Sequence, residues 1–268
     1  MIRLVATDVD GTLFNSRREV SEGNRLALKR AQEMGLMICL ASGRYLNTLR
    51  PVALEAQVKG PLITCNGAYI LNQHGQPVLD ECLTSSGRGR VLDYAVENEV
   101  QVNIYQPDRV VASRRGAMYA LYCSRTRIEC EILAIEKMAL LRPTKMVMVD
   151  TPERIIQHTL FFQPIVKALA IELTTSEPEY LEFLPLGVNK GIGLQRLCDH
   201  LGFAREEVAA LGDFYNDLEM VQWAGLGGAV GNGAPELKAA ADVVVETNDE
   251  DGLAQFLALV EQYNVQRI

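Results

Sequence analysis

Residues 4–13, LVATDVDGTL, lead from an apolar run into two aspartates, a glycine and a threonine. The run from Ile2 to Ala6 predicts a buried strand. Residues two apart on an extended segment share one face, so the side chains of Asp8 and Asp10 are expected to face the same small space. That space lies beyond the carboxyl end of the strand, where open α/β sheets bind ligands, and Gly11 allows the backbone to turn sharply there.

Two carboxylates this close repel each other, so we expect a cation between them, a raised carboxyl pKa, or both. The alternative is a strand end with a solvated aspartate pair before a turn. The sequence DVDGT after an N-terminal apolar strand resembles the first motif of the haloacid dehalogenase-like phosphohydrolases. In that family the first aspartate is a nucleophile and the second a general acid and base, and the resemblance assigns these roles to Asp8 and Asp10.

A chain of 268 residues can bury a sizeable core and form one large domain or two smaller ones. Its net charge of −8 argues against nucleic acid or an anionic membrane surface as the main partner, but not against a small anionic substrate. We find no secretion-signal pattern and no apolar run of membrane-spanning length, so we expect a cytoplasmic protein. The six cysteines form no CxxC pair, and we expect all of them to be reduced thiols.

Strands and helices alternate at both ends of the sequence. The first part predicts helix 22–34, strand 36–41, helix 45–55 and strand 61–65. The last part predicts helix 190–201, strands 208–211, 226–230 and 243–245, and helix 252–263. This alternation predicts an α/β fold with a parallel, doubly wound, Rossmann-like sheet.

The middle of the sequence has a different rhythm. It predicts helices at 91–97 and 152–163 and strands at 100–105, 110–112, 145–150, 168–174 and 180–184, whereas residues 114–131 give no clear assignment. Such a mixture predicts a separate α+β domain inserted into the parallel one. The predicted boundaries are 1–83 and 186–268 for the core domain and 84–185 for the insertion.

Polar residues follow four of the predicted core strands: Asp8 and Asp10, Ser42, Asp213 and Asp217, and Asn232. Because the carboxyl ends of parallel strands lie at one edge of a sheet, these residues are expected to converge. The reaction we infer is phosphoryl transfer to an aspartate followed by hydrolysis, which requires a site that positions and neutralises the phosphate. Asp8 would be the nucleophile, while Asp10 would protonate the leaving alkoxide and then activate water.

Asp213 and Asp217 lie where a strand gives way to a helix. Acidic residues there could serve only to satisfy the helix dipole. The alternative is a Mg²⁺ site, because Mg²⁺ prefers a few carboxylates with water and substrate phosphate, and carboxylates crowded beside a phosphate require such an ion. We expect Asp8 and Asp213 to bind Mg²⁺ directly, together with the main-chain carbonyl of Asp10. Asp217 is expected to be either a further ligand or an anchor for the ligands.

Four residues are candidates for contact with the phosphate. Ser42 can hydrogen-bond a phosphate oxygen, assisted by main-chain N–H groups such as that of Gly43 at the start of the next helix. Lys190 is a cation at a helix start, which opposes the helix dipole unless a phosphate and the Asp8 carboxylate lie nearby. Asn216 can donate an amide N–H. The simpler alternatives are caps for Ser42 and Asn216 and a solvated surface position for Lys190.

The motifs, taken in order, resemble the Cof-type branch of the haloacid dehalogenase-like superfamily over residues 1–83 and 186–268. They are DVDGT from Asp8, SGR from Ser42, NGA from Asn66, KG from Lys190 and GDFYND from Gly212. The resemblance implies a Mg²⁺-dependent phosphatase of small phosphorylated metabolites such as sugar phosphates. It also implies that residues 84–185 form a type IIB α/β cap that closes over the site and selects the substrate. Phe214 and Tyr215 depart from the family pattern, in which smaller or polar residues are common, and could narrow the mouth of the site.

The sequence leaves two other functions to weigh, and it is compatible with a monomer or a homodimer. A phosphotransferase such as a phosphomutase would form the same aspartyl-phosphate but return the phosphate to a sugar. A regulatory or binding protein would keep the fold without turnover, but the complete set of nucleophile, acid, lysine and metal carboxylates argues against it. A dehalogenase has no need of Asp10 or of a metal.

Overall fold

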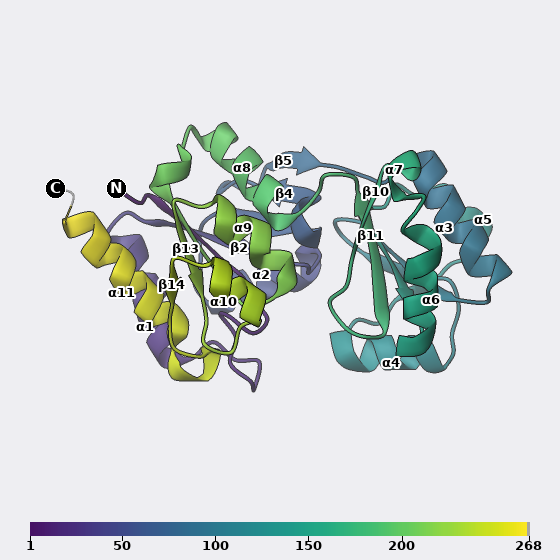
Figure 1. Cartoon of the computed structure of the whole chain (residues 1–268), viewed down its shortest axis with the longest axis horizontal. Helices are drawn as coiled ribbons and strands as arrows, with labels where there is room; N and C mark the ends of the chain where they lie inside the picture. Colours follow the sequence, from purple (N-terminus) through teal and green to yellow (C-terminus); the bar gives the residue numbers. More distant parts are fainter. Residues whose placement is uncertain (267–268) are drawn as a thin grey trace. The chain divides into compact units, whose positions relative to one another are not determined.

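The chain folds as two compact units, one formed by Met1–Leu79 together with Asn189–Ile268 and the other by Asp80–Val188. We call them the core unit and the inserted unit (Figure 1). The computed structural model describes residues 1–266. None of the helices within these residues is long and apolar enough to span a membrane.

The core unit contains one sheet, which has eight strands within the described residues. In spatial order these are β14 (Val243–Val244), β13 (Leu226–Ala229), β12 (Val208–Gly212), β1 (Leu4–Thr7), β2 (Met37–Ala41), β3 (Leu62–Thr64), β4 (Tyr69–Leu71) and β5 (Pro77–Asp80). Neighbouring strands from β14 to β3 run parallel, whereas β3 and β4 are antiparallel. The predicted parallel sheet is therefore confirmed.

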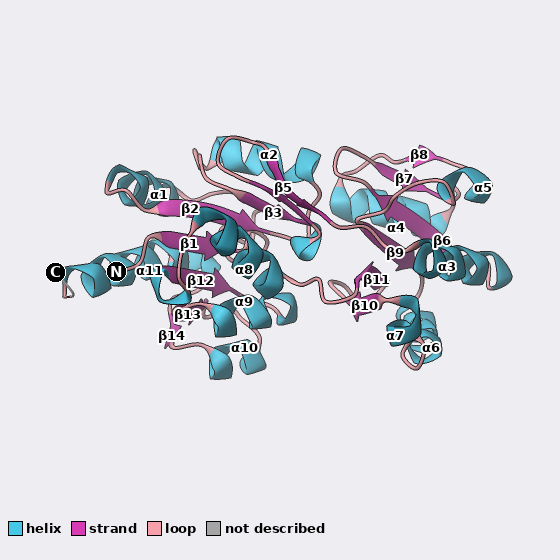
Figure 2. Cartoon of the chain, turned by 90° about the horizontal axis from the view of Figure 1, so that it is seen from above, coloured by secondary structure: helices cyan, strands magenta, loops and turns pink. Residues whose placement is uncertain are grey.

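Helices cover both faces of this sheet (Figure 2). They are α1 (Glu22–Glu33), α2 (Leu46–Glu55), α8 (Lys190–Leu201), α9 (Leu218–Trp223), α10 (Pro235–Ala240) and α11 (Gly252–Val265), with 3₁₀ turns at Cys65–Gly67, Arg205–Glu207, Tyr215–Asp217 and Asn248–Glu250. Alternate side chains of a strand point to opposite faces, and β1 shows the result. Val5 packs in one apolar cluster with residues of α1, α2 and α11, while Leu4 and Ala6 pack in another with residues of α8 and α9. The sheet is doubly wound, as predicted.

Local signals explain which core elements the sequence revealed. The side chain of Ser21 accepts a hydrogen bond from the Asn24 N–H at the start of α1, and Gly35 follows its end with a φ of +89°. Strands β4 and β5 were not predicted. They flank a turn that contains Gly75, and β5 is only partly buried, so it lacks the continuous apolar run that marks the other strands.

The inserted unit is α+β, as predicted. Its sheet has the strand order β10 (Ile171–Thr174), β11 (Tyr180–Pro185), β9 (Lys145–Val149), β6 (Gln101–Tyr105), β7 (Val110–Ala112) and β8 (Glu131–Ile132). The strands pair antiparallel except for β7 with β8. The helices are α3 (Ser85–Glu97), α4 (Ala117–Thr126), α5 (Ile135–Met138), α6 (Pro152–Phe162) and α7 (Val166–Leu169).

Two element predictions in the inserted unit need correction, and a stretch that the sequence left unassigned contains a helix. Helix α3 begins well before the predicted start at residue 91, because Thr84 caps it despite the low helix propensity of Gly87 and Gly89. The predicted strand 168–174 is wrong in its first part, where α7 ends and Ala170 adopts a φ of +54° before β10 begins. The unassigned stretch 114–131 contains α4, which starts without a side-chain cap.

The register of the core sheet aligns the strand ends that carry the candidate site. Thr7, the last residue of β1, lies opposite Leu211 of β12 and Leu40 of β2. Ala41, the last residue of β2, lies opposite Ile63 of β3. The polar residues that follow these strands therefore emerge at one edge of the sheet.

Candidate active site

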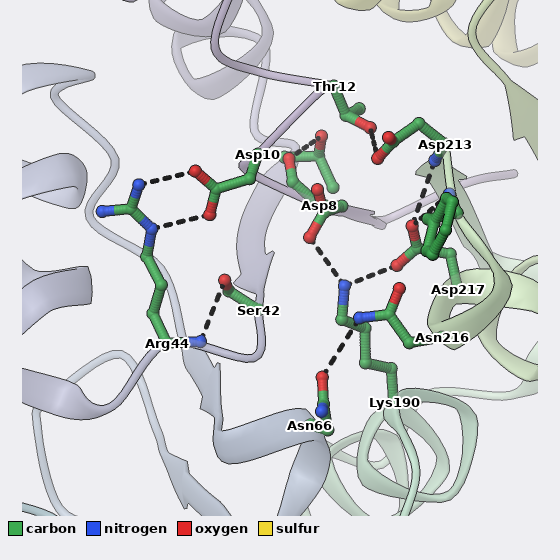
Figure 3. Close-up of polar contacts among 12 residues, drawn as sticks. Asp8, Asp10, Thr12, Ser42, Arg44, Asn66, Lys190, Asp213, Asn216 and Asp217 are labelled. Carbon is green, nitrogen blue, oxygen red and sulfur yellow. Dashed lines mark hydrogen bonds and ion pairs between the residues drawn. The ribbon is translucent and has the colours of Figure 1, made fainter. Parts of the chain in front are cut away.

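Asp8 leaves the carboxyl end of β1 and is almost fully buried, with 4% of its surface exposed. Its Oδ1 accepts a hydrogen bond from Lys190 Nζ at 2.6 Å. Lys190 is the first residue of α8, and its Nζ also donates to Asp217 Oδ1 at 2.5 Å. Because Lys190 is only 1% exposed, it is not a solvated surface lysine. Its ammonium lies between two buried carboxylates (Figure 3).

Asp217 is held on both sides of its carboxylate. Oδ1 accepts from Lys190, while Oδ2 accepts from the main-chain N–H groups of Asp213 and Phe214 at 3.0 and 3.1 Å. The turn needs a glycine beside it, since a Cβ on Gly212 would lie 2.4 Å from the Cβ of Asp217. These contacts give Asp217 the geometry of an anchor for the lysine and for the turn that presents Asp213.

Asp213 completes a cluster of three acidic side chains. One carboxylate oxygen from each of Asp8, Asp213 and Asp217 lies within 4.8 Å of the others. Thr12 Oγ1 donates to Asp213 Oδ1 at 3.0 Å and so fixes this carboxylate from the opposite loop. Gly11, with a φ of +88°, comes so close that a Cβ there would lie 2.3 Å from Asp213 Oδ2. Only glycine allows that approach.

The cluster carries more negative than positive charge, because one ammonium faces three carboxylates. Burial raises the pKa of Asp8 well above its usual value, although Lys190 opposes the shift. Burial, followed by the charge of Asp217, raises the pKa of Asp213 to about 6. Burial alone would lower the pKa of Lys190, but the carboxylates of Asp217 and Asp8 outweigh it and raise that pKa. A divalent cation would offset this excess, and the all-oxygen donor set suits a hard ion such as Mg²⁺.

The Asp10 side chain lies outside this cluster. Its two oxygens accept hydrogen bonds from the guanidinium of Arg44, with Nε 2.7 Å from Oδ2 and Nη2 2.6 Å from Oδ1. Figure 3 shows this carboxylate directed toward Arg44 and away from Lys190. The backbone of Arg44 is fixed, since its N–H donates to Ser42 Oγ at 3.2 Å and its carbonyl accepts from the Cys65 N–H at 2.8 Å. The sequence pattern indicated no role for Arg44 beyond its place in the SGR motif.

The predicted phosphate-contacting residues Ser42, Gly43 and Asn216 lie close to Asn66. Asn216 Nδ2 donates to Asn66 Oδ1 at 3.2 Å (Figure 3). A Cβ on Gly43 would lie 3.0 Å from the same oxygen. Ser42 is buried and accepts the Arg44 N–H within the loop, but it does not cap the next helix, since α2 begins after Tyr45 without a side-chain cap. The contact of Ser42 with a phosphate stays a prediction.

Asn232 and Asn248 hold the turn that follows Asp8. The strand-end pattern pointed to Asn232 only. Asn232 Nδ2 donates to the carbonyl of Gly11 at 2.9 Å, and Asn232 Oδ1 accepts from the N–H of Asn248 at 2.9 Å. Asn248 Nδ2 in turn donates to the carbonyl of Phe14 at 2.9 Å. These two asparagines fix the main chain of the turn that follows Asp8. A sequence pattern cannot distinguish this role of an asparagine from helix capping.

Comparison with known proteins agrees with this geometry. A family model for haloacid dehalogenase-like hydrolases matches residues 5–257. The chain is 30% identical over 254 residues to 5-amino-6-(5-phospho-D-ribitylamino)uracil phosphatase YcsE of Bacillus subtilis. The aligned region covers 95% of this chain and 94% of the relative. The chain is 26% identical over 274 residues to pyridoxal phosphate phosphatase YbhA of Escherichia coli, covering 95% and 97% of the two chains. The crystal structure of a haloacid dehalogenase-like hydrolase from Bacteroides thetaiotaomicron superimposes with a TM-score of 0.88 at 30% identity, covering 97% of this chain and all of the other.

The chain therefore belongs to the haloacid dehalogenase-like hydrolases. The resemblance that its motifs indicated is confirmed, as is the fold class. Both named relatives are phosphatases, which supports the enzyme class predicted from the motifs.

Proposed function

We propose that this protein is a Mg²⁺-dependent phosphatase that hydrolyses small phosphorylated metabolites through an aspartyl-phosphate. The observation that carries the proposal is the position of Asp8. Its carboxylate is buried at the carboxyl edge of the parallel sheet, 2.6 Å from the Lys190 ammonium and beside two further carboxylates. A nucleophile in such a site is oriented by the lysine and separated from bulk water.

The proposed reaction has two steps. An Asp8 oxygen forms a bond to phosphorus while the ester P–O bond breaks, and the leaving oxygen takes a proton from Asp10. Water then attacks the same phosphorus and gives a proton to Asp10, while the bond between phosphorus and Asp8 breaks and inorganic phosphate leaves. Lys190 keeps Asp8 oriented and offsets part of the charge of the phosphate. Ser42, Gly43 and Asn216 are proposed to hydrogen-bond the phosphate oxygens.

We assign the metal site to Asp8 and Asp213, together with the main-chain carbonyl of Asp10. Asp217 is an anchor in this proposal, because both of its oxygens already accept hydrogen bonds. The raised pKa values of Asp8 and Asp213 support a cation in this position. Bound Mg²⁺ would supply positive charge that offsets the carboxylates and the phosphate together.

The substrate class is proposed from the relatives and from the inserted unit. YcsE and YbhA are named for different phosphate esters, a ribitylaminouracil phosphate and pyridoxal phosphate, and both are small metabolites. The phosphate-handling residues of this chain all lie in the core unit. We therefore propose that the inserted unit acts as the cap that selects the rest of the substrate.

The test is Mg²⁺-dependent phosphate release from 4-nitrophenyl phosphate by the wild type and by Asp8→Asn, with exposed Asp199→Asn of α8 as the matched control. We expect release that needs Mg²⁺, persists in the control and is lost in Asp8→Asn. Activity that survives in Asp8→Asn would exclude Asp8 as the nucleophile. If the aryl ester is not cleaved, a panel of small phosphate esters follows, and no release from any of them would contradict the phosphatase. Phosphate release without an acceptor product separates hydrolysis from phosphotransfer.

A further inference from the structure

The segment after β3 has an unusual backbone. Cys65, Asn66 and Gly67 adopt φ values of +50°, +55° and +104° in succession. Glycine adopts this region freely and asparagine tolerates it, but cysteine has no such preference. Strained backbone of this kind persists where the surrounding structure holds it in place, and it concentrates at functional sites. Here the Cys65 N–H donates to the carbonyl of Arg44 and the Asn66 N–H to the carbonyl of Ser42, at 2.8 and 3.1 Å.

This backbone conformation positions the Asn66 side chain between two loops. Asn66 is only 3% exposed, and its Oδ1 accepts the hydrogen bond from Asn216 Nδ2. The same oxygen lies 3.0 Å from the position that a Cβ on Gly43 would occupy, so the missing side chain of Gly43 makes room for it. One loop follows β2 and the other follows β12, and both carry residues proposed to bind the phosphate.

From these contacts we infer that Asn66 is the positioning residue of the phosphate site. It fixes the amide plane of Asn216, so that one N–H donates to Asn66 and the other is left for a phosphate oxygen. The absence of a side chain at Gly43 leaves room for the Asn66 oxygen in this position. Asn66 acts through these neighbours and not on the reacting atoms. The inference rests on the proposed phosphatase function and deepens it.

The residue type fits this role in three ways. Asparagine tolerates the positive φ, its carbonyl oxygen accepts from an amide, and it carries no charge. An aspartate in its place would keep the acceptor but repel the phosphate. The NGA motif from Asn66 to Ala68 thus gains a physical role that the sequence alone did not provide.

The test compares Asn66→Gly, Asn216→Ala and the double variant in the Mg²⁺-loaded protein, with inorganic phosphate as the probe. Asn66→Gly removes the side chain and relieves the positive φ, so we expect an unchanged or higher melting temperature. The inhibition constant for phosphate and the Michaelis constant for the aryl ester should both rise about five- to tenfold, the value of one lost hydrogen bond. The double variant should bind phosphate no more weakly than Asn216→Ala. Cys65→Gly is the matched control, since it adds the same backbone freedom one residue earlier and should keep the wild-type constants.

Each outcome bears on the proposal. Wild-type phosphate affinity in Asn66→Gly would overturn the proposal. It would also be overturned if the loss of phosphate affinity in the double variant equalled the product of the losses in the two single variants. Equal weakening in Cys65→Gly would assign the effect to loop flexibility and overturn it as well. A wild type that releases phosphate while Asn66→Gly behaves normally would leave the phosphatase function standing without this role. A wild type that neither hydrolyses esters nor binds phosphate would overturn both.

Discussion

Arg44 donates two parallel hydrogen bonds to the carboxylate of Asp10, at 2.7 Å from Nε to Oδ2 and at 2.6 Å from Nη2 to Oδ1. Such a fork fixes the plane as well as the position of a carboxylate. The Arg44 guanidinium also lies over the ring of Phe14, 5.3 Å from its centroid. Asp10 is half exposed, so without this partner its side chain would be free to rotate. Arg44 therefore fixes the position of the Asp10 carboxylate, the proposed general acid and base, in the resting protein.

The first prediction concerns Arg44→Ala and Arg44→Lys. Both remove the two-bond fork, because a lysine ammonium cannot match both carboxylate oxygens in one plane. We expect kcat/KM for a simple alkyl phosphate to fall about tenfold or more, because its alkoxide needs a well-placed proton donor. The value for 4-nitrophenyl phosphate should change less than about twofold, because its leaving group needs little protonation.

Arg50→Ala, an exposed position on the following helix, is the control for this measurement and should behave as the wild type with both esters. In an Asp10→Asn background, loss of Arg44 should have no further effect on the alkyl ester. An equal fall for both esters would show that Arg44 acts through general folding and not through Asp10.

The second prediction concerns Lys190→Met. Lys190 is 1% exposed and lies between Asp8 and Asp217, so its removal leaves buried carboxylates without their cation. The metal-free variant should lose about 3–5 kcal/mol of unfolding free energy in urea, because breaking a buried ion pair leaves an uncompensated charge. The double variant Lys190→Met with Asp217→Asn should recover part of this loss.

The comparison for this prediction is Lys29→Met in α1. Lys29 is 61% exposed and pairs with Glu33 at 3.8 Å on the surface, so its loss should change the stability by less than about 0.5 kcal/mol. Equal stability of the two lysine variants would contradict the prediction, because it would mean that the carboxylates around Lys190 are solvated or protonated and carry no buried charge for the lysine to offset.

Much of the fold and of this site could be predicted because both depend on short-range patterns. Helix α8 has the predicted bounds, Lys190–Leu201, and a buried apolar strand followed by polar residues locates both Asp8 and Asp213. Parallel strands bring such residues to one edge of the sheet. The topology brings the charges to that edge but does not set their spacing, since Asp10, expected to share the space of Asp8, turns to Arg44 instead.

The remaining features depend on where the ends of side chains go and on backbone strain. Nothing in the sequence states that Arg44 reaches Asp10, or that Asn66 adopts a positive φ and receives the amide of Asn216. The pair of strands β4 and β5 and the short helix α7 were missed for another reason. Strand β5 is only partly buried and lacks a continuous apolar run, and the four residues of α7 are too few to show a helical period.

The third prediction concerns pH and metal removal. In the metal-free protein the pKa of Asp213 is raised from 3.8 to about 6, so the folded state binds a proton more tightly than the unfolded state. A raised carboxyl pKa means that folding is favoured by protonation, so the contribution of Asp213 to stability falls as the pH rises from about 4 to about 6 and is then level. We expect the melting temperature in EDTA to rise on acidification from about pH 7 to about pH 5.

Mg²⁺ should reverse this dependence, because it binds only the deprotonated carboxylates and its stabilisation grows with pH. Thermal melts with and without Mg²⁺ at several pH values measure both effects. Asp213→Asn should weaken the metal-free pH dependence, leaving the part that comes from Asp8, and remove the stabilisation by Mg²⁺. A Mg²⁺ effect of wild-type size in Asp213→Asn would exclude Asp213 as a ligand.

The last prediction separates backbone strain from damage to the carboxylate cluster. Gly11→Ala places a Cβ at a φ of +88° and 2.3 Å from Asp213 Oδ2, so the carboxylate must move. Gly75→Ala meets a similar φ of +74°, but nothing lies within 4 Å of its added Cβ. Both variants should lose about 1–2 kcal/mol of stability from the positive φ. Only Gly11→Ala should lose Mg²⁺ affinity, by about tenfold or more in a calorimetric titration, because it displaces an oxygen of the proposed metal site. Equal Mg²⁺ affinity in the two variants would mean that Asp213 Oδ2 takes no part in binding the ion.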